Sequence, residues 1–559
     1  MAGLAEKPLR NPAVTWLRTY SRQDLRKDII AGLIVAVMLV PQAMAYAMLA
    51  GLPPVVGLYA STVPLLAYAC LGTSRQLAVG PVAIVSLLVA DACVGPAGTV
   101  ADVATITGRA AALALLVGAI QIALGLCRAG FLLNFVSHAV VSGFTSAGAI
   151  MIGLSQFGHL LGVKLSGGNS VLALALDVMR NLSDTHLPTL AIGLGAVAIQ
   201  LLARFKRWRF PVTLPIIAAA ILLVWTFNLE AYGVRAVGKV SSGLPAWRLP
   251  DMSWNGIRHL LPSAWMIVFI GTMESIAVAK WIATREKYRI DANREMLGLG
   301  LANVAGGLFS GYPVAGGFSR TAVNYQAGAR TPLASVFTAA LVLLTLLFLT
   351  PLFTHLPNAV LAAIILVAVI GLIDFKEARY LFKIKQADGW SFVVTFLVTL
   401  GFGMDRGLLA GIAFSLMLFV LRSARPGMSI LGRVGEQEFR DLRRYPDAVT
   451  QPWLLILRFE ASLYFANAGF VEDRIRELLA QQPEVRWVLL DMSGVNDIDG
   501  VAVSMLTELM RDCAAANVQF ACAGMKAGVR DIVRRAGWGD LPGDRMFYPN
   551  LQQALAALP

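Results

Sequence analysis

The sequence predicts an α-helical polytopic membrane protein followed by a small cytoplasmic α/β domain. Of its 559 residues, 57% are hydrophobic and only 14% are charged, and the mean hydropathy is +0.67, as is typical of chains that cross the bilayer repeatedly. Apolar segments recur from residue 29 to about residue 421, and strands alternate with helices after residue 453. We therefore divide the chain into an N-terminal cytoplasmic segment (1–28), a transmembrane region (29–425), a linker (426–452) and a C-terminal domain (453–559).

The apolar segments form two sets of about seven, separated by a polar stretch near 230–255. They predict about fourteen helical segments in two halves. The first set lies near 29–52, 54–72, 79–92, 110–127, 131–158, 187–203 and 211–228. The second set lies near 260–283, 294–312, 318–329, 333–350, 356–373, 390–403 and 407–421. Residues 374–385 are charged with interleaved aromatic residues, which favours an amphipathic helix on the cytoplasmic surface.

The distribution of charge predicts the orientation. The net charge of +13 does not indicate nucleic-acid binding, because the basic residues form short clusters between apolar runs and not one continuous patch. Most clusters fall on one side if the N-terminus is cytoplasmic, as expected for loops that collect Lys and Arg. Residues 1–28 are polar and basic and show no cleavable signal. We expect a multi-pass protein of the cell (inner) membrane with the N-terminus and the C-terminal domain in the cytoplasm.

Each half contains one short apolar segment that follows an extended, glycine-bearing stretch, at 77–83 and at 312–320. Interrupted segments at matching positions of two halves indicate the central site of a transporter. Pro81 suits the first turn of a helix, where its missing N–H is no loss, so Val82 and Ala83 present free amides. Two half-helix N-termini are then expected to meet near the midplane of the membrane. The alternative is that Gly80-Pro81 and Gly316-Gly317 are only kinks.

Arg320 follows Gly316 and Gly317 at the start of the second short segment. A guanidinium at membrane depth costs about 2.5–3.5 kcal/mol on insertion scales, so it requires a cavity, a partner or an anion. The glycines allow the backbone to turn into a helix whose free N–H groups point toward the same place as Arg320. The pattern predicts an anion site.

Glu274 lies inside the apolar run 265–276, where a carboxylate is rarely without a role. It is either the structural counter-ion of Arg320 or a proton carrier, because loss of solvent favours the neutral acid. Both roles can follow one another: an anion that competes for Arg320 would leave Glu274 without its partner and ready to take up a proton. We favour proton coupling through Glu274.

Four motifs in sequence order resemble the sulfate permease family of secondary anion transporters. They are VPQAMAYA (40–47), GLPPVVGLY (51–59), GTSR (72–75) and FSRTAVN (318–324). The resemblance covers nearly the whole chain. It implies an inverted repeat of seven plus seven segments of the uracil-permease type, in which a core domain moves against a gate domain, and a homodimer.

The resemblance also implies that the anion lies between the third and tenth helices, with contacts from the first. Tyr46 is open to a second interpretation as a packing residue, and Val82 replaces an aromatic residue of prestin-like members, which suits an anion larger than chloride. An acidic residue at the position of Glu274 marks coupled members, with Glu for protons and Asp for sodium. Matching the motifs gives the substrate-binding set Gln42, Tyr46, Val79, Gly80, Pro81, Val82, Ala83, Gly317, Phe318, Ser319 and Arg320.

The C-terminal domain shows strands near 453–459, 487–492 and 518–523 and helices near 468–481, 501–516 and 529–536, which predicts an α/β fold. The run VLLDMSGVNDIDG (488–500) resembles the STAS domain. The position aligned with the phosphorylated serine of that family is Val501, so the switch residue is absent. We expect a structural or regulatory domain with a possible cytoplasmic protein partner or dimer contact.

The predicted function is proton-coupled symport of sulfate or a C4-dicarboxylate by alternating access. The alternatives are a bicarbonate/chloride exchanger, or an anion channel or sensor that signals through the STAS domain. An enzyme is not predicted, because the sequence has no nucleophile–base pair or phosphate loop. The five cysteines lack metal-type spacing, so neither a metal nor a cofactor is expected.

Overall fold

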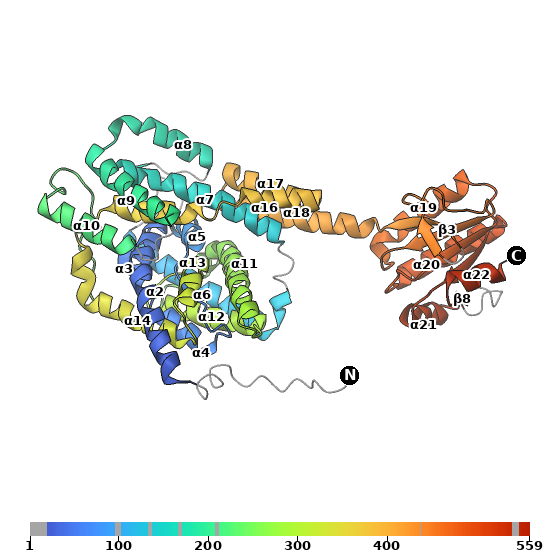
Figure 1. Cartoon of the computed structure of the whole chain (residues 1–559), viewed down its shortest axis with the longest axis horizontal. Coiled ribbons are helices and arrows are strands. Elements are labelled where there is room, and N and C mark those ends of the chain that lie inside the picture. Colours follow the sequence, from blue (N-terminus) through green and yellow to red (C-terminus); the bar gives the residue numbers. More distant parts are fainter. Residues whose placement is uncertain are drawn as a thin grey trace. The chain divides into compact units, whose positions relative to one another are not determined.

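The computed structural model describes residues 20–94, 102–131, 137–165, 170–206, 212–435, 438–538 and 547–558 (Figure 1). The chain divides into two compact units, Met1–Ser415 and Leu416–Pro559. Most of the expected N-terminal segment 1–28 lies outside the described residues. Its last residues already belong to a helix, because Ser21 and Asp24 cap each other's backbone N–H groups and start that helix at Arg22.

The first unit is helical, and its elements occur in two successive halves. The first half contains α2 (Arg22–Leu49), α3 (Pro54–Tyr59), α4 (Val63–Leu71), β1 (Val79–Gly80), α5 (Ala83–Val94), α6 (Val103–Leu126), α7 (His138–Leu161), α8 (Val171–Arg180), the short η2 (Leu182–Asp184), α9 (Leu187–Phe205) and α10 (Thr213–Thr226). The second half contains α11 (Trp254–Arg285), α12 (Ala292–Leu308), β2 (Ala315–Gly316), α13 (Phe318–Gln326), α14 (Leu333–Leu344) with its continuations η3 (Thr345–Leu349) and η4 (Thr350–Phe353), α15 (Asn358–Ile370), α16 (Phe375–Ile384), α17 (Gln386–Phe402) and α18 (Met404–Ala424).

This architecture confirms the predicted polytopic helical class. Each apolar segment expected from the sequence contains a helix, although residues 132–136 of the segment 131–158 and residue 211 of the segment 211–228 lie outside the described part. Nine stretches of the described residues are long and apolar enough to cross a membrane by length and composition. The expected amphipathic helix is α16. The sequence analysis missed α8, a mostly apolar helix of ten residues that is too short to span a bilayer and buries only Leu174.

The helices of the first unit pack in two groups that meet around α2 and α5. In one group, α12 packs against α6 and α4, and α14 packs against α2. In the other group, α15 and α17 pack against α7, and α9 packs against α15. Small residues allow this close approach: a Cβ on Gly118 of α6 would lie 2.6 Å from the carbonyl oxygen of Gly300 on α12. The two groups correspond to the predicted core and gate domains.

The two short strands pair antiparallel inside the core group, with Val79 opposite Gly316 and Gly80 opposite Ala315. Helix α5 begins three residues after Gly80, and α13 begins two residues after Gly316. With twelve and nine residues, respectively, both are too short to span a bilayer. The two halves of the chain therefore meet where β1 pairs with β2, and one half-helix starts after each of these strands.

The second unit is an α/β domain with a six-stranded sheet in the order β4-β3-β5-β6-β7-β8. Strands β5 to β8 are parallel, and β3 is antiparallel to β4 and β5. Three helices pack with one sheet face, and α22 packs with the other. The strands are β3 (Met428–Val434), β4 (Glu438–Asp441), β5 (Leu454–Phe459), β6 (Trp487–Asp491), β7 (Gln519–Ala523) and β8 (Phe547–Tyr548), and the helices are α19 (Phe465–Gln481), α20 (Gly500–Ala515), α21 (Ala527–Arg535) and α22 (Leu551–Ala557).

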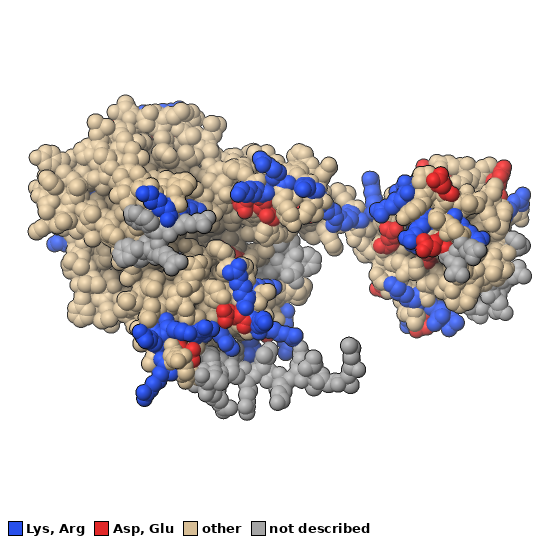
Figure 2. All heavy atoms as spheres, viewed as in Figure 1, with Lys and Arg blue, Asp and Glu red and all other residues tan. Residues whose placement is uncertain are grey.

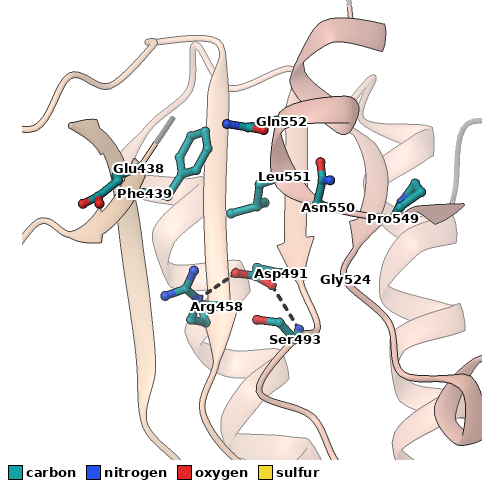
Figure 3. Close-up of a pocket in the computed structure, with 10 residues that line it drawn as sticks. All are labelled: Glu438, Phe439, Arg458, Asp491, Ser493, Gly524, Pro549, Asn550, Leu551 and Gln552. Atoms are coloured by element: carbon teal, nitrogen blue, oxygen red, sulfur yellow. Dashed lines mark hydrogen bonds and ion pairs between the residues drawn. The ribbon is translucent and has the colours of Figure 1, made fainter. Parts of the chain in front are cut away.

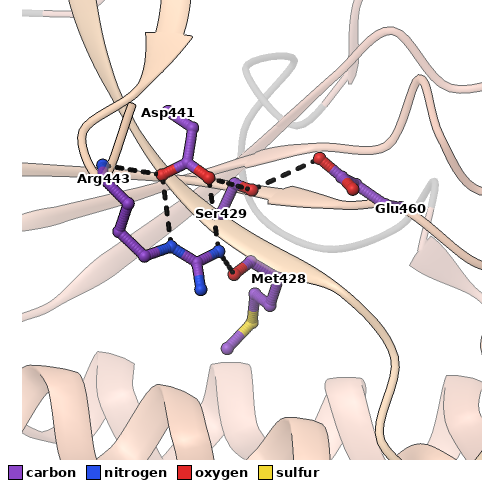
Figure 4. A network of polar contacts seen from close by, with 5 residues as sticks. All are labelled: Met428, Ser429, Asp441, Arg443 and Glu460. Carbon is purple, nitrogen blue, oxygen red and sulfur yellow. Dashed lines mark hydrogen bonds and ion pairs between the residues drawn. The ribbon is translucent and has the colours of Figure 1, made fainter. Parts of the chain in front are cut away.

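This sheet corrects the expected linker over 426–452, because β3 and β4 belong to the folded domain. Both strands are joined by Asp441 (Figure 4), whose carboxylate accepts hydrogen bonds from the Ser429 hydroxyl at 3.0 Å and from Arg443. Partial burial by itself would raise the pKa of Asp441, but the hydrogen bonds from Arg443 and Ser429 hold it below its usual value. The half-polar strand β4 has no hydropathy signal of its own, so only the pairing reveals it.

Candidate functional site

A small cavity of about 100 Å³ lies where the two half-helices begin. Its walls come from α2, the start of α5, α11, the start of α13, and α15 with the turn after it. The lining residues are Gln42, Tyr46, Val82, Ala83, Ile84, Glu274, Gly317, Phe318, Ser319, Arg320, Ala368 and Leu372. The structure thus brings together nine of the residues named from the sequence, and both halves of the chain contribute to one site.

Arg320 is the central charge of this cavity. Its side chain is almost fully buried, with 1% exposure. Nη1 donates to the Pro81 carbonyl oxygen at 2.5 Å and to Gln42 Oε1 at 3.5 Å, whereas Nε and Nη2 have no hydrogen-bond partner. Buried charged donors without acceptors are costly. An anion in the cavity would supply the missing acceptors.

Val79, Gly80 and Pro81 do not line the cavity; they form the backbone that surrounds the guanidinium. Gly80 has a φ of 154°, in the range that favours glycine. A Cβ at Gly80 would lie 3.3 Å from Nη2 of Arg320, and a Cβ at Gly317 would lie 3.1 Å from the same atom. A side chain at either position would press on the guanidinium, which would have to shift by a few tenths of an ångström.

The two helix N-termini add partial positive charge to the same cavity. The first backbone hydrogen bonds of the two helices run from Ser86 N to Val82 O at 2.9 Å and from Thr321 N to Gly317 O at 3.0 Å. The backbone N–H groups before Ser86 and Thr321 in each first turn consequently make no hydrogen bond within their helix. Such amides and the helix dipole together favour an anion.

Gln42 and Tyr46 lie one helical turn apart on α2 and form a polar wall of the cavity. The Gln42 amide nitrogen donates to the Tyr46 hydroxyl oxygen at 2.9 Å, and the Gln42 amide oxygen accepts from Arg320. Because the hydroxyl of Tyr46 is an acceptor in this contact, its own hydrogen remains available to a ligand. Both side chains are more than nine-tenths buried.

Glu274 lines the cavity from α11. No ion pair within 4.0 Å joins it to Arg320, although both residues are described and face the same space. A permanent Glu274–Arg320 counter-ion pair, one of the two roles expected from the sequence, is therefore not present in this structure. The Glu274 carboxylate and the Arg320 guanidinium are not paired with each other. A bound anion would lie between these two groups or beside them.

A buried polar network, which the sequence analysis did not identify, holds β2 in place. Asn303 of α12 accepts from Val314 N at 2.7 Å and donates to Val314 O at 3.1 Å, so its side chain pairs like a neighbouring strand. Ser275, next to Glu274, accepts from Gly316 N at 2.7 Å. Asn303 also donates to Gln121 Oε1 on α6 at 2.9 Å. Isolated polar residues in apolar helices are the only sequence signal for this network.

A matching set of contacts holds the strand before α5. Thr321 Oγ1 accepts from Ala78 N at 3.0 Å, and Asn324 Nδ2 donates to Gln76 O at 2.9 Å. Ile84, Ala368 and Leu372 complete the lining but carry no polar group that would have identified them. The start of α5 is thus fixed by side chains from the second half of the chain, whereas β2, before α13, is held by side chains of its own half.

A second cavity, of about 640 Å³, lies in the C-terminal domain near the carboxyl ends of its central strands (Figure 3). Arg458 Nε donates to Asp491 Oδ2 at 2.6 Å, and the Ser493 N–H donates to Asp491 Oδ1 at 3.0 Å. The two central charges of this cavity therefore neutralise each other. Among the described residues, no group of three or more His, Cys, Asp or Glu side chains is placed to hold a metal ion.

The chain is similar to known families and proteins over most of its length. Residues 25–395 match the sulfate permease family, and residues 445–554 match the STAS domain. An Arabidopsis thaliana protein named "Sulfate transporter 4.1, chloroplastic" is 37% identical over 566 residues, which cover 97% of this chain and 82% of the relative. A Mycobacterium tuberculosis protein named "Probable sulfate transporter" is 35% identical over 550 residues, which cover 98% of this chain and 97% of the relative.

Two solved structures show the same fold. The murine Slc26a9 anion transporter, in an inward-facing state, is 25% identical and superimposes with a TM-score of 0.89 over 98% of this chain and 93% of its own. The transmembrane domain of the cyanobacterial bicarbonate transporter BicA is 22% identical, with a TM-score of 0.60 over 71% of this chain and 98% of its own. The second similarity shows the fold of the transmembrane region alone.

Proposed function

We propose, from the premise that this chain belongs to the sulfate permease family, that it is a secondary active transporter that moves sulfate across the cell membrane together with a proton. The observation that carries the proposal is the buried Arg320 guanidinium, which lines a cavity between two half-helix N-termini with two nitrogen atoms that have no acceptor. Sulfate offers four oxygen acceptors and no donor at neutral pH, which complements a site made of amides, a hydroxyl and a guanidinium.

The size of the cavity favours sulfate over a C4-dicarboxylate. The cavity is small, with a volume of about 100 Å³, and Arg320 is the cationic side chain among its described lining residues. A compact tetrahedral oxyanion suits this space better than an extended dicarboxylate with two separated charges. The names of the relatives, which are sulfate transporters from a plant and a bacterium, support the same choice.

Alternating access is supported by the position of the cavity between the two helix groups. Arg320, Gln42 and Glu274 belong to elements of the core group, whereas Ala368 on α15 belongs to the gate group. The contribution of the gate group to the lining is apolar. The core group can therefore carry the anion past α15 without breaking hydrogen bonds to the gate.

Glu274 is the proposed proton carrier. It lies on the cavity wall without an ion-pair partner, so its charge state can respond to the anion and to solvent that reaches the cavity. An anion beside a charged carboxylate is repelled, and protonation of Glu274 removes that repulsion. Binding of sulfate and binding of a proton then favour each other, as a symporter requires.

The test is sulfate uptake into proteoliposomes with and without an inward proton gradient, for the wild type, Glu274→Gln and the matched control Glu286→Gln. Glu286 is an exposed carboxylate directly after α11, so its removal changes the same charge outside the cavity. We expect gradient-driven accumulation in the wild type and the control, and only downhill exchange in Glu274→Gln. Uphill sulfate uptake by Glu274→Gln would contradict the proposed role of Glu274 as proton carrier.

The same vesicles separate the proposed substrate from the alternatives. Fumarate, succinate, bicarbonate and chloride are offered in competition with labelled sulfate. Sulfate is expected to be displaced only by excess unlabelled sulfate or close oxyanions. Stronger competition by a dicarboxylate would change the substrate, and fast chloride flux that ignores the proton gradient would favour an exchanger or a channel.

A further inference from the structure

Helix α16 carries charged and apolar residues and is expected to lie at the surface of the membrane. It connects the end of α15 to the beginning of α17, and both of these helices are apolar elements of the gate group. A ten-residue helix between two successive spans runs along one surface of the bilayer. None of its residues is buried in the structure.

The rotation of α16 about its own axis is fixed by contacts on its inner side. Glu377 Oε1 lies 3.4 Å from Nδ1 of His138 at the start of α7. The Phe382 ring lies 5.8 Å from the Trp390 ring, and a Cβ on Gly389 would approach Phe382 to 2.5 Å, so the phenyl ring fills the space that this glycine leaves. The opposite side of the helix therefore has a defined outward face.

That outward face carries a basic stripe. Lys376, Arg379 and Lys383 follow one another at spacings of three and four residues, which places them on one side of the helix. All three are exposed, and none of them forms an ion pair within 4.0 Å with a carboxylate of the described residues. Figure 2 shows Lys and Arg atoms gathered in the region of α16 and α17, with Asp and Glu atoms directly beside them.

Apolar side chains border the stripe on both sides. Tyr380 and Ile384 are 57% and 63% exposed, and Phe375, at the start of the helix, is 58% exposed. A soluble acidic protein would leave these side chains partly in water, whereas a lipid offers phosphate to the basic groups and hydrocarbon to the apolar ones. The pattern of charge and apolar surface therefore matches a lipid.

We propose that the outward face of α16 binds the phosphate headgroups of anionic phospholipids through Lys376, Arg379 and Lys383, with Phe375, Tyr380 and Ile384 at the acyl boundary. Because α16 is held to α7 and α17, the bound lipid anchors the gate group to this leaflet. The surface lies outside the anion cavity, and the inference does not depend on which anion is transported.

The experiment measures lipid binding directly, without a transport readout. The detergent-purified full chain is titrated with phosphatidylglycerol, and bound lipid is counted by native mass spectrometry with phosphatidylcholine as the neutral reference. The test variant is Lys376→Gln/Arg379→Gln/Lys383→Gln. The matched control is Lys280→Gln/Lys287→Gln/Arg289→Gln, which removes three exposed basic residues at the end of α11 and in the loop after it.

Each basic residue near an anionic surface contributes roughly a fivefold preference, so we expect the test variant to lose its preference for phosphatidylglycerol by at least about tenfold. The control is expected to stay close to the wild type. An unchanged preference in the test variant, or an equal loss in the control, overturns the assignment to α16. Equal competition by soluble glycerol phosphate would also overturn it, because it would indicate a site for free phosphate.

A charge-preserving variant, Lys376→Arg/Lys383→Arg, separates the proposal from misfolding. It is expected to retain the preference of the wild type. Size-exclusion profiles and thermal unfolding of all variants show whether the fold is intact. If the charge-preserving variant loses binding while it remains folded, the stripe does not act through its charge and the proposal fails.

Discussion

Replacement of Arg320 by alanine tests the geometry of the anion site most directly. In the wild type, Nε and Nη2 lack acceptors and Nη1 is held by Pro81 and Gln42. A bound sulfate can thus receive two hydrogen bonds from the guanidinium, and alanine removes both together with the only cationic side chain that the described residues contribute to the cavity wall. The half-helix amides remain in the variant.

The expected loss follows from these two contacts. Hydrogen bonds that involve a charged group contribute about 1.5–3 kcal/mol each, so two of them correspond to about 3–6 kcal/mol. Since 1.4 kcal/mol is tenfold in affinity, Arg320→Ala should weaken sulfate binding by at least about 100-fold. Arg320→Lys keeps the positive charge but loses the planar guanidinium, so its sulfate affinity should lie between those of the wild type and Arg320→Ala.

The assay is equilibrium binding of labelled sulfate to the purified protein, with thermal unfolding as the folding control. Arg109→Ala is the matched control, because Arg109 of α6 donates to the Cys93 carbonyl oxygen at 3.2 Å and does not line the cavity. It should leave sulfate affinity unchanged. If folded Arg320→Ala binds sulfate within about threefold of the wild type, the assignment of this cavity as the anion site is refuted.

Three further predictions follow from the contacts around the site and in the C-terminal domain. Asn303→Ala leaves both backbone groups of Val314 without their partner. We therefore expect a raised KM for sulfate, with less change in the maximal rate, in measurements of initial uptake. Asn303→Asp keeps the acceptor for Val314 N–H and should recover part of the affinity for sulfate. Asp441→Asn should lower the unfolding temperature of the full chain at neutral pH, where the depressed pKa of Asp441 contributes stability. The difference in unfolding temperature between wild type and variant should shrink as the pH falls through that pKa. A difference that persists in acid would contradict the role of the Asp441 charge. The exposed Cys70 and Cys127 should react with a membrane-impermeant maleimide in inside-out but not in right-side-out vesicles, and labelling from the opposite side would reverse the proposed orientation. Cys522, whose burial raises its pKa to about 12, should react only after unfolding.

The class of the protein was predictable from local features of the chain, and the same features located its candidate site. Hydropathy is a property of each segment, so the apolar helices could be placed without knowledge of their neighbours. Gly80, Gly316 and Gly317 interrupt two of these segments at matching positions, and Arg320 is conspicuous because a charge at membrane depth needs compensation. The same reasoning singled out Glu274.

Only the tertiary structure decided how these groups are satisfied. The acceptors of Arg320 come from Pro81 and Gln42, more than two hundred residues away, and the strand that carries Gly316 is held by Ser275 and Asn303. It also separated Glu274 from Arg320, lined one side of the cavity with Ala368 of α15 and Leu372 after that helix, and placed β3 and β4 in the C-terminal sheet. The sequence by itself determined which groups are polar, charged or flexible, because those are properties of single residues; the partner of each group depends on packing between distant segments, which no local pattern specifies.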